Sequence, residues 1–594
     1  MKFKILSSFL ILFVSFSFIS PQKPNPEITI SELRQHIAFL ASDEMKGRKP
    51  GTAEDKLVAS YIQEQFKRYG LKLSGNKGFQ PVHLVAGVEL GFHNALTIEG
   101  RELKLMDEFI PLSFSESATL ISKLSFVGFG YNINNDTNSW DDYEGVDVSG
   151  NWVLILNGEP KQEGRANPFE EFSALRTKVL TARDHGASGV LFVNSVMKSK
   201  EDELPELAYD KVESTAGIPV IHIDRKSADL FLSKLNYSVE ILENEMNEYK
   251  KPHSFALDVE VKGVTELFLK RVESQNIIAM VKGSDPLLKN EYIVVGAHYD
   301  HLGMGGQGSG SRNPDIIAVH NGADDNASGV AGVIELAGKF QSIRKELKRS
   351  IVFVAFTGEE MGLLGSRKFV ESELFANSNI KAMINFDMIG RMNKETLALL
   401  IGGSGSAVES DSLLNLSANK YGFKLKLSPE GYGPSDHASF YAKDIPVIFI
   451  STGPHADYHT SLDDIDKIDF EGQRKVLWFS YDLIKELAAA AQPLTFKDAG
   501  PKERSSSGSY KITLGIMPDF AAGDVKGLRV EVVRKGGPAY QGGMLDGDII
   551  TALNGLAVGN IYDYMNRLKK LNKGDSITVD VLREGKTEVL IIQL

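Results

Sequence analysis

The stretch YIVVGAHYDHLG, Tyr292 to Gly303, is a short apolar run that ends in two histidines and an aspartate. His298 and Asp300 are two residues apart, so on an extended strand they share one face. A carboxylate in that place can hold the neighbouring imidazole in its metal-binding tautomer. The stretch therefore predicts a buried strand that ends in a metal ligand and the group that orients it.

Similar apolar runs alternate with helical patterns from about residue 260 to residue 492. Such alternation predicts an α/β fold with a doubly wound, mixed sheet. The clearest segments are the expected helix Val330–Phe340 and the expected strands Tyr292–Ala297, Ile351–Phe356, Lys381–Asp387 and Ile445–Ile450. Ligands of open α/β sheets gather beyond the carboxyl ends of the strands. We therefore expect polar residues that follow these strands to lie close together.

Carboxylates and a second histidine stand at those positions. The segment NGADDNASGVAGVIELA, Asn321 to Ala337, carries Asp324 and Asp325 just before a helix, where an aspartate can equally be an amino-terminal cap. Two adjacent glutamates, Glu359 and Glu360, follow the next strand within TGEEMGLLGS, and adjacent like charges are costly unless a cation or a proton offsets them. The segments NFDMIGR and DYHTSLDDID add Asp387 and His459. Five such nitrogen and oxygen donors suit two zinc ions with open positions.

The chain contains no cysteine, so any zinc must be bound by His, Asp and Glu. The net charge of -12 and the lack of a basic stripe argue against nucleic-acid binding. Lys2 and Lys4 precede an apolar stretch from Ile5 to about Ile19, which is short for a membrane span. We expect residues 1–20 to be an export signal that is cleaved. The protein would then be periplasmic or secreted, with no membrane contact after cleavage. An uncleaved anchor is the alternative.

The motifs together resemble the two-zinc exopeptidases, a family that includes bacterial leucyl-type aminopeptidases, glutamate carboxypeptidases and the metal-free transferrin receptor. LASDEMKGRKPGT, Leu40 to Thr52, resembles the opening segment of the family, and SDHASF, Ser435 to Phe440, its late substrate-side motif. The resemblance covers most of the chain and is specific because every metal motif occurs in order.

The resemblance implies a role for each candidate. It makes His298 and Asp387 ligands of one zinc ion, and Glu360 and His459 ligands of the other. It makes Asp325 the bridge between the two ions and Glu359 the general base. It also makes Asp300 the group that orients His298, and Tyr458 the donor to the developing oxyanion. It also implies a cis peptide bond after Asp325.

Four more histidines lie near the motifs, and we expect them to be supporting or loop residues, with His437 a possible lining residue of the substrate pocket: His301, His320, His437 and His455.

Two accessory regions flank this core. Residues 106–256 are strand-rich and resemble the protease-associated (PA) domain, with GNWVLILNG, GASGVLFVN and GIPVIHI as its motifs, although a generic lid is the alternative. Residues 510–594 resemble a PDZ domain, in which TLGIM stands at the carboxylate-binding loop with one of the usual two glycines. The expected order is thus peptidase 26–105, insert 106–256, peptidase 257–492, a serine-rich linker 493–509 and the PDZ-like domain 510–594.

The expected function is a zinc-dependent exopeptidase, most simply an aminopeptidase, that acts on peptides or proteins. A carboxypeptidase of the same fold and an inactive, receptor-like peptide-binding protein are the alternatives. Intact ligand motifs disfavour the inactive form, and the sequence shows no basic cluster that must bind a substrate carboxylate. A peptide carboxyl terminus is the expected ligand of the PDZ-like domain.

Overall fold

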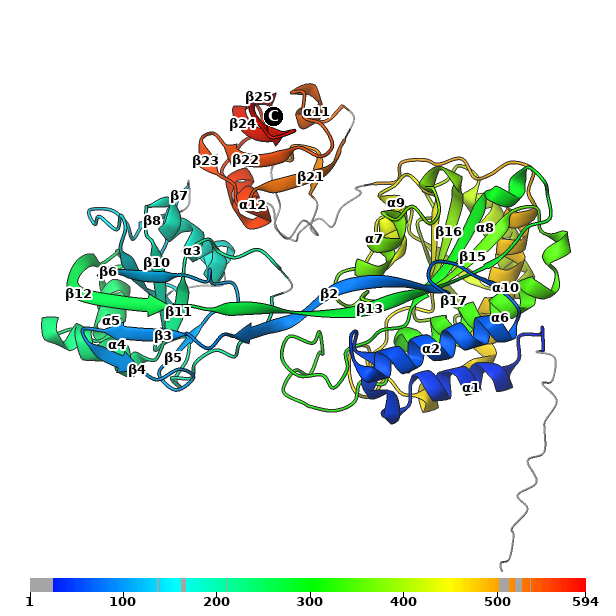
Figure 1. Ribbon diagram of the computed structural model, residues 1–594, viewed down its shortest axis with the longest axis horizontal. Coiled ribbons are helices and arrows are strands. Elements are labelled where there is room, and N and C mark those ends of the chain that lie inside the picture. The colour runs from blue at the N-terminus through cyan, green and yellow to red at the C-terminus, as the bar shows by residue number, and fades with distance from the viewer. Residues whose placement is uncertain are drawn as a thin grey trace, which may run out of the picture.

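The computed structural model describes residues 25–135, 138–161, 167–210, 212–500, 512–518, 526–534 and 536–594. The expected export signal and the serine-rich stretch 505–509 lie outside these residues. Figure 1 shows three bodies: an α/β domain, an inserted domain joined to it by a long two-stranded ribbon, and a small C-terminal domain. Across the described residues, no helix combines the length and the apolar character that a membrane crossing needs.

The α/β domain is built on a mixed sheet, which confirms the expected fold class. Within the described residues its path is β1-β13-β15-β14-β16-β19-β17-β18, and β2 pairs with β13. The strands are β1 (Lys72–Leu73), β2 (Phe79–Leu90), β13 (Leu267–Val281), β14 (Tyr292–His298), β15 (Ser350–Phe356), β16 (Ile380–Phe386), β17 (Ala398–Gly402), β18 (Lys424–Leu427) and β19 (Val447–Ser451). The central strands β15, β14, β16 and β19 are parallel, so their carboxyl ends meet at one edge.

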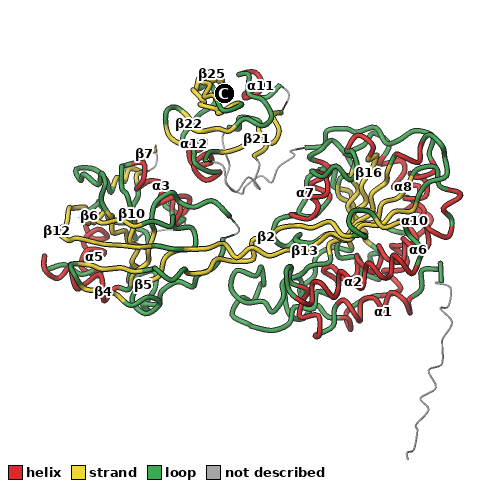
Figure 2. Tube along the Cα trace, viewed as in Figure 1, coloured by secondary structure: helices red, strands yellow, loops and turns green. Residues whose placement is uncertain are grey.

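Helices cover both faces of this sheet (Figure 2). One face packs against a large apolar cluster supplied by α1 (Ile30–Leu40), α2 (Ala53–Arg68), α6 (Gly329–Ser342), α8 (Ser410–Tyr421) and α10 (Phe470–Ala489). The other face packs against the shorter helices α7 (Leu364–Val370) and α9 (His437–Tyr441). The first two helices begin at threonine caps, Thr29 and Thr52, whose side chains accept a backbone N–H of the first turn.

The inserted domain has a second sheet, ordered β4-β3-β12-β6-β9-β10-β11-β5 in the described chain. These strands are β3 (Ala95–Ile98), β4 (Arg101–Leu103), β5 (Phe109–Pro111), β6 (Thr119–Val127), β9 (Trp152–Asn157), β10 (Gly189–Asn194), β11 (Val220–Ile223) and β12 (Ser254–Val264); a separate pair is β7 (Asn132–Asn135) and β8 (Asn138–Asp141). Its helices are α3 (Leu175–Asp184), α4 (Arg225–Leu232) and α5 (Val239–Tyr249). The sheet extends beyond the expected boundaries 106 and 256, because β3, β4 and β12 pair with the insert rather than with the α/β sheet.

The C-terminal domain is a small β fold with its own apolar core. It comprises β20 (Ile516–Pro518), β21 (Leu528–Val533), α11 (Pro538–Gln541), β22 (Ile549–Leu553), β23 (Leu556–Ala557), α12 (Ile561–Lys569), β24 (Ser576–Arg583) and β25 (Lys586–Gln593).

The first half of the expected linker packs against the α/β domain. Phe496 and Ala499 pack on the apolar cluster around Tyr441. The Tyr441 hydroxyl donates to Asp498 at 3.1 Å and to the carbonyl of Gly500 at 2.9 Å. The α/β domain therefore continues to about Gly500, eight residues beyond the expected end at Gln492. The polar composition of residues 493–500 does not show that they pack on the domain.

Candidate metal centre

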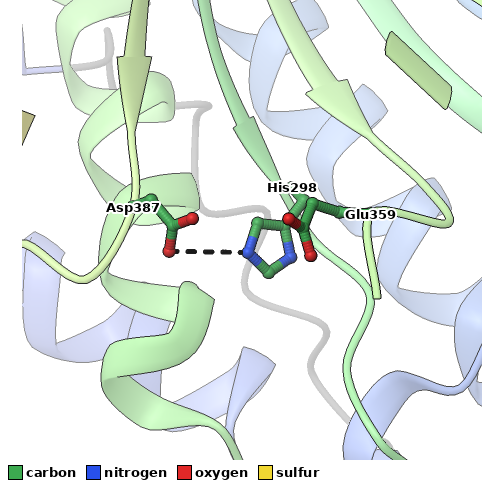
Figure 3. Close-up of side chains that lie close together, drawn as sticks. All are labelled: His298, Glu359 and Asp387. Atoms are coloured by element: carbon green, nitrogen blue, oxygen red, sulfur yellow. Dashed lines mark ion pairs between the residues drawn. The ribbon is translucent and has the colours of Figure 1, made fainter. Parts of the chain in front are cut away.

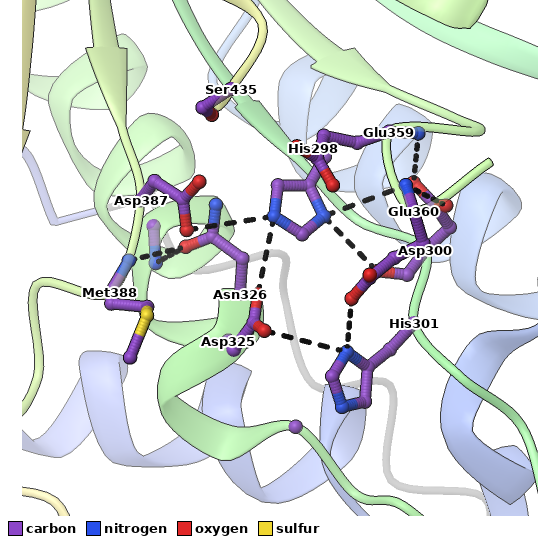
Figure 4. Close-up of polar contacts among 12 residues, drawn as sticks. His298, Asp300, His301, Asp325, Asn326, Glu359, Glu360, Asp387, Met388 and Ser435 are labelled. Carbon is purple, nitrogen blue, oxygen red and sulfur yellow. Dashed lines mark hydrogen bonds and ion pairs between the residues drawn. The ribbon is translucent and has the colours of Figure 1, made fainter. Parts of the chain in front are cut away.

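The structure brings all five expected ligands to the edge where the parallel strands end. Figure 4 shows four of them there: His298, Asp325, Glu360 and Asp387. His298 ends β14, and Asp325 lies in the turn 323–328 that leads into α6. Because β14 and β15 run in register, with His298 opposite Phe356, the loop after β15 carries Glu360 to the same edge. Asp387 directly follows β16, and His459 follows β19 in the loop before α10.

The Asp325 carboxylate lies between two groups of donors. Its Oδ1 is 3.3 Å from Nε2 of His298, and that nitrogen is 3.6 Å from Oδ1 of Asp387. Its Oδ2 is 3.3 Å from Nε2 of His459, which in turn is 3.2 Å from Oε2 of Glu360. Each oxygen of the Asp325 carboxylate therefore faces a different histidine. Each of these histidines also lies close to a second carboxylate.

The donor set fits divalent cations. His298 and Asp325 are buried, and neither Nε2 of His298 nor Oδ2 of Asp325 has a hydrogen-bond partner within the described chain. Unpartnered buried polar atoms are costly unless something binds them. Imidazole nitrogen and carboxylate oxygen, with no cysteine in the chain, are ligands that zinc accepts.

The charges of the site are strongly coupled. Burial lowers the pKa of His459, but its contacts with Asp325 and Glu360 outweigh burial and raise that pKa to about 10. Burial likewise opposes protonation of His298, yet Glu359 and Asp325 hold the pKa of this histidine well above its usual value. The surrounding carboxylates thus favour positive charge at this site, which a bound cation would supply.

Glu359 lies beside His298, with Asp387 on the far side of the ring (Figure 3). One ligand atom from each of these residues falls within a cluster no wider than 4.8 Å. Burial, reinforced by the neighbouring Glu360 charge, raises the pKa of the Glu359 carboxyl well above its usual range. The Glu359 side chain is therefore buried beside His298, next to the expected metal positions.

Asp300 makes contacts different from those expected. Nδ1 of His298 lies 3.2 Å from the backbone carbonyl of Asp300 and 3.9 Å from its carboxylate. The carboxylate instead accepts the backbone N–H groups of Glu359, at 3.2 Å, and Glu360, at 3.4 Å. Asp300 thus orients His298 through its main chain and positions the glutamate pair through its side chain.

Tyr458 is stacked on the ring of His459, with ring centres 3.9 Å apart and an interplanar angle of 22°. Burial raises the pKa of the Tyr458 phenol above its usual value, so the hydroxyl keeps its proton. The peptide bond between Asp325 and Asn326 is cis, as expected. Asn326 accepts the backbone N–H of Met388 at 3.3 Å and so ties the turn to the end of β16.

Sequence reasoning underestimated three residues. Nδ1 of His301, expected to be a supporting or loop residue, is 2.8 Å from Oε1 of Glu360 and contacts a candidate ligand directly. Asp463 accepts the N–H groups of Asp324 and Asp325. Asp436 is fully buried, and neither of its carboxylate oxygens has a hydrogen-bond partner in the described part of the chain. All three residues lie within the quoted motifs, and that position was the only sequence feature that could have indicated their contacts: His301, Asp436 and Asp463.

Comparison with known families supplies the deciding observation. The family described as peptidase family M28 matches residues 276–483, which contain every candidate ligand. Over these residues the α/β domain is therefore similar to peptidase family M28, and we call it the M28 domain. The PA domain matches residues 119–231 of the insert, and the PDZ domain matches residues 502–594.

Curated relatives of the M28 domain carry consistent names. A probable zinc metalloprotease of Pyrenophora tritici-repentis is 39% identical over 23% of this chain and 29% of its own length. A probable leucine aminopeptidase of Arthroderma otae is 30% identical over 33% of this chain and 56% of its own length. The chain therefore spans less than two thirds of these two relatives.

A longer match is aminopeptidase YwaD of Bacillus subtilis, 24% identical over 75% of this chain and 80% of that protein. Among solved structures, the aminopeptidase from Aneurinibacillus sp. strain AM-1 is 21% identical, with a TM-score of 0.46 over 80% of this chain and 95% of that chain.

Proposed function

We propose that this protein is a metallopeptidase that holds two zinc ions per chain and removes residues from free amino termini. The observation that carries the proposal is the Asp325 carboxylate, whose two oxygens each face a different histidine at 3.3 Å. A carboxylate in that arrangement suits a bridge between two cations. Relatives named zinc metalloprotease and leucine aminopeptidase support the choice of metal and reaction.

Each ion would have its own protein ligands. Asp387 and His298 would hold one, Glu360 and His459 the other, with Asp325 shared. Zinc bound there supplies Lewis acidity, which polarises a carbonyl and lowers the pKa of water towards about 7. The ligands come from the ends of different strands, so the fold of the M28 domain fixes their spacing.

Glu359 would act as general base and then as general acid. Its carboxylate takes a proton from the attacking water and later gives that proton to the nitrogen of the leaving amine. The Tyr458 hydroxyl would donate a hydrogen bond to the oxyanion that develops on the substrate carbonyl. Asp300 keeps Glu359 in place through the hydrogen bond to its backbone N–H at 3.2 Å.

The direction of cleavage is tested by blocking the amino terminus. We expect hydrolysis of short peptides with a free amino terminus and no hydrolysis of the same peptides after amino-terminal acetylation. Release of carboxyl-terminal residues from both forms would establish the carboxypeptidase alternative. Absence of hydrolysis from the zinc-loaded protein with any peptide would favour the inactive, peptide-binding alternative.

We also propose that the protein is exported and acts on peptide or protein substrates outside the cytoplasm. The charged and apolar pattern of residues 1–20 supports export. For the PDZ domain we propose a peptide carboxyl terminus as ligand, received near Leu514, Gly515 and Ile516. Gly515 has a φ of +73°, which a glycine adopts without strain.

A further inference from the structure

The PDZ domain contacts the PA domain through two ion pairs that cross in opposite directions. In the PDZ helix α12, Arg567 donates both terminal nitrogens to the two carboxylate oxygens of Asp184, at 2.6 and 2.8 Å. In return Arg183, beside Asp184 in the PA helix α3, donates to Asp563 of α12 at 2.6 Å. Figure 1 shows α12 facing α3 across this contact. We call these four residues the reciprocal clamp.

The PDZ half of the reciprocal clamp is buried, whereas the side chains of Arg183 and Asp184 in the PA half stay 22% and 17% exposed. Asp563 and Arg567 are each only 3% exposed. The Asp563 carboxylate also accepts the N–H of Gly559 at 2.8 Å, which fixes its direction. A bidentate arginine–carboxylate pair is a strong and directional contact, and removal of one partner leaves a buried charge uncompensated. Exposed pairs would add little, whereas these pairs can fix the orientation of the PDZ domain on the PA domain.

The same contact holds residues 212–217 of the PA domain. Asn560, at the start of α12, donates to the carbonyl of Thr215 at 3.1 Å, and Arg183 donates to the carbonyl of Ala216 at 2.7 Å. Gly217 adjoins this contact and has a φ of +78°, which a glycine adopts without strain.

A second arginine links residues 212–217 to the neighbouring residues 205–210. Arg176 of α3 donates to the carbonyl of Ser214 at 3.0 Å and to the carboxylate of Asp210 at 2.7 Å. Ala208 in turn comes near the M28 domain, because its Cβ lies 3.8 Å from the position that a Cβ at Gly308 would take.

Gly308 belongs to residues 303–312, a glycine-rich loop beside the metal centre. The carbonyl of Gly310 accepts Nδ1 of His459 at 3.0 Å, and the N–H of Arg312 donates to the carbonyl of His459 at 2.9 Å. The described contacts thus run from α12 through α3 and Ala208 to the loop that orients a candidate zinc ligand.

We propose that the reciprocal clamp docks the PDZ domain on the PA domain and, through residues 205–210 and 212–217, restrains the glycine-rich loop beside His459. The PDZ domain is then docked, and it restrains a loop of the metal centre instead of moving as a freely tethered module. Any consequence for peptide hydrolysis rests on the proposed function, but the docking and the restraint do not.

Hydrogen exchange of the zinc-loaded protein tests the restraint without an activity measurement. In Arg567→Glu and in Asp184→Arg we expect faster amide exchange in residues 212–217 and in residues 303–312. Combining Asp184→Arg with Arg567→Glu restores opposite charges, so exchange should return towards the wild-type rate. Lys573→Glu makes the same charge change as Arg567→Glu at an exposed position of the PDZ domain and should change neither segment.

Retained protection in β24 and β25 shows that the PDZ domain itself stays folded in each variant. Unchanged exchange in both segments of the single variants would overturn the clamp. Faster exchange in residues 212–217 alone would overturn the restraint of the glycine-rich loop.

A distance measurement tests docking even if a charge variant does not fold. Because the chain has no cysteine, spin labels can be placed at Lys226→Cys and Lys586→Cys, both exposed and in different domains. We expect one narrow distance distribution in the wild-type background. A broad distribution there would show a mobile PDZ domain and overturn the proposal.

Discussion

At the residue scale, the site depends on neighbouring carboxylates that have different roles. Asp325 faces both His298 and His459, whereas the Asp300 carboxylate accepts the backbone N–H groups of the glutamate pair. The difference comes from position: Asp325 is in a turn that points into the site, and Asp300 lies past the end of β14, next to the loop after β15. Identical side chains therefore take ligand and positioning roles according to the backbone that carries them.

Glu359→Gln tests the general base. Glutamine keeps the size of the side chain but cannot accept the proton, so we expect kcat to fall by about 100-fold or more with zinc content unchanged. The measurement is kcat on a short aminoacyl substrate, with zinc content determined on the same sample. Near-normal turnover would rule out Glu359 as the base.

Zinc stoichiometry tests the bridging role of Asp325. We expect two zinc ions in the wild-type chain, about one in His459→Ala and the fewest in Asp325→Ala, because only Asp325 serves both groups. Metal analysis after dialysis measures this order, and Asp466→Asn, an exposed aspartate of the same motif as His459, is the control. A wild-type chain with at most one ion under zinc-replete conditions would contradict the two-zinc proposal.

At the element scale, burial of the strand β11 disfavours the charged form of its histidine. His222 of β11 is 1% exposed and lies 3.2 Å from the side-chain oxygen of Asn194. Burial, with a smaller contribution from Lys198, lowers the pKa of His222 to about 4. Folding of the PA core therefore favours the unprotonated ring.

His222→Gln should make the PA domain less sensitive to acid. The unfolded chain takes up a proton near pH 6.5 and the folded chain only near pH 4, so this histidine lowers stability as pH falls between those values. The full effect is about 3 kcal/mol. Asp142, whose pKa burial raises to about 7, acts in the opposite direction, so wild type and variant must be compared at each pH.

Tryptophan fluorescence can report this domain alone. Trp140 and Trp152 belong to the PA core, and Trp478 to α10 of the M28 domain. In a Trp478→Phe background, thermal unfolding between pH 7 and pH 4.5 should show a smaller loss of Tm for His222→Gln than for its parent. Equal losses would mean that His222 does not titrate as its burial requires.

At the scale of the whole molecule, three domains meet although one ribbon and one linker connect them. The ribbon β2–β13 leaves the α/β sheet and carries the PA domain, and the PDZ domain returns to contact that domain through α12. Residues 494–500 do not act as a free tether, because Tyr441 donates to Asp498 and Gly500. The end of the M28 domain is consequently set by tertiary contacts and not by a change in amino-acid composition.

Truncation at two positions separates the contribution of residues 493–500 from that of the PDZ domain. A chain that ends at Gly500 should bind zinc normally and keep kcat on a single-residue aminoacyl substrate within about threefold of wild type, since the described ligands all precede Gly500 and strand ends hold them. Its KM can rise because the glycine-rich loop is released. A tenfold loss of kcat would show that the PDZ domain helps to build the active site.

A chain that ends at Gln492 should be less stable than the chain that ends at Gly500, because Tyr441 and the apolar cluster around it lose their partners. Thermal unfolding of the two chains, each loaded with zinc, measures the difference. Equal Tm values would show that residues 493–500 do not stabilise the domain.

The sequence by itself determined the mixed α/β fold, the PA and PDZ regions and the chain segments that carry the ligands. Apolar periodicity and strand ends are local properties, and in a parallel sheet they force His298, Glu360 and Asp387 to one edge. The cis bond after Asp325 also followed from the resemblance and is present.

Only the tertiary structure decided which groups touch. The contact of His301 with Glu360 joins residues 59 positions apart, and the pair Arg567–Asp184 joins residues 383 positions apart. Such contacts depend on how separate elements pack, and a charged side chain in a sequence looks the same whether it is solvated or buried against a partner. For that reason the two accessory domains were predicted from their motifs, whereas their docking was not.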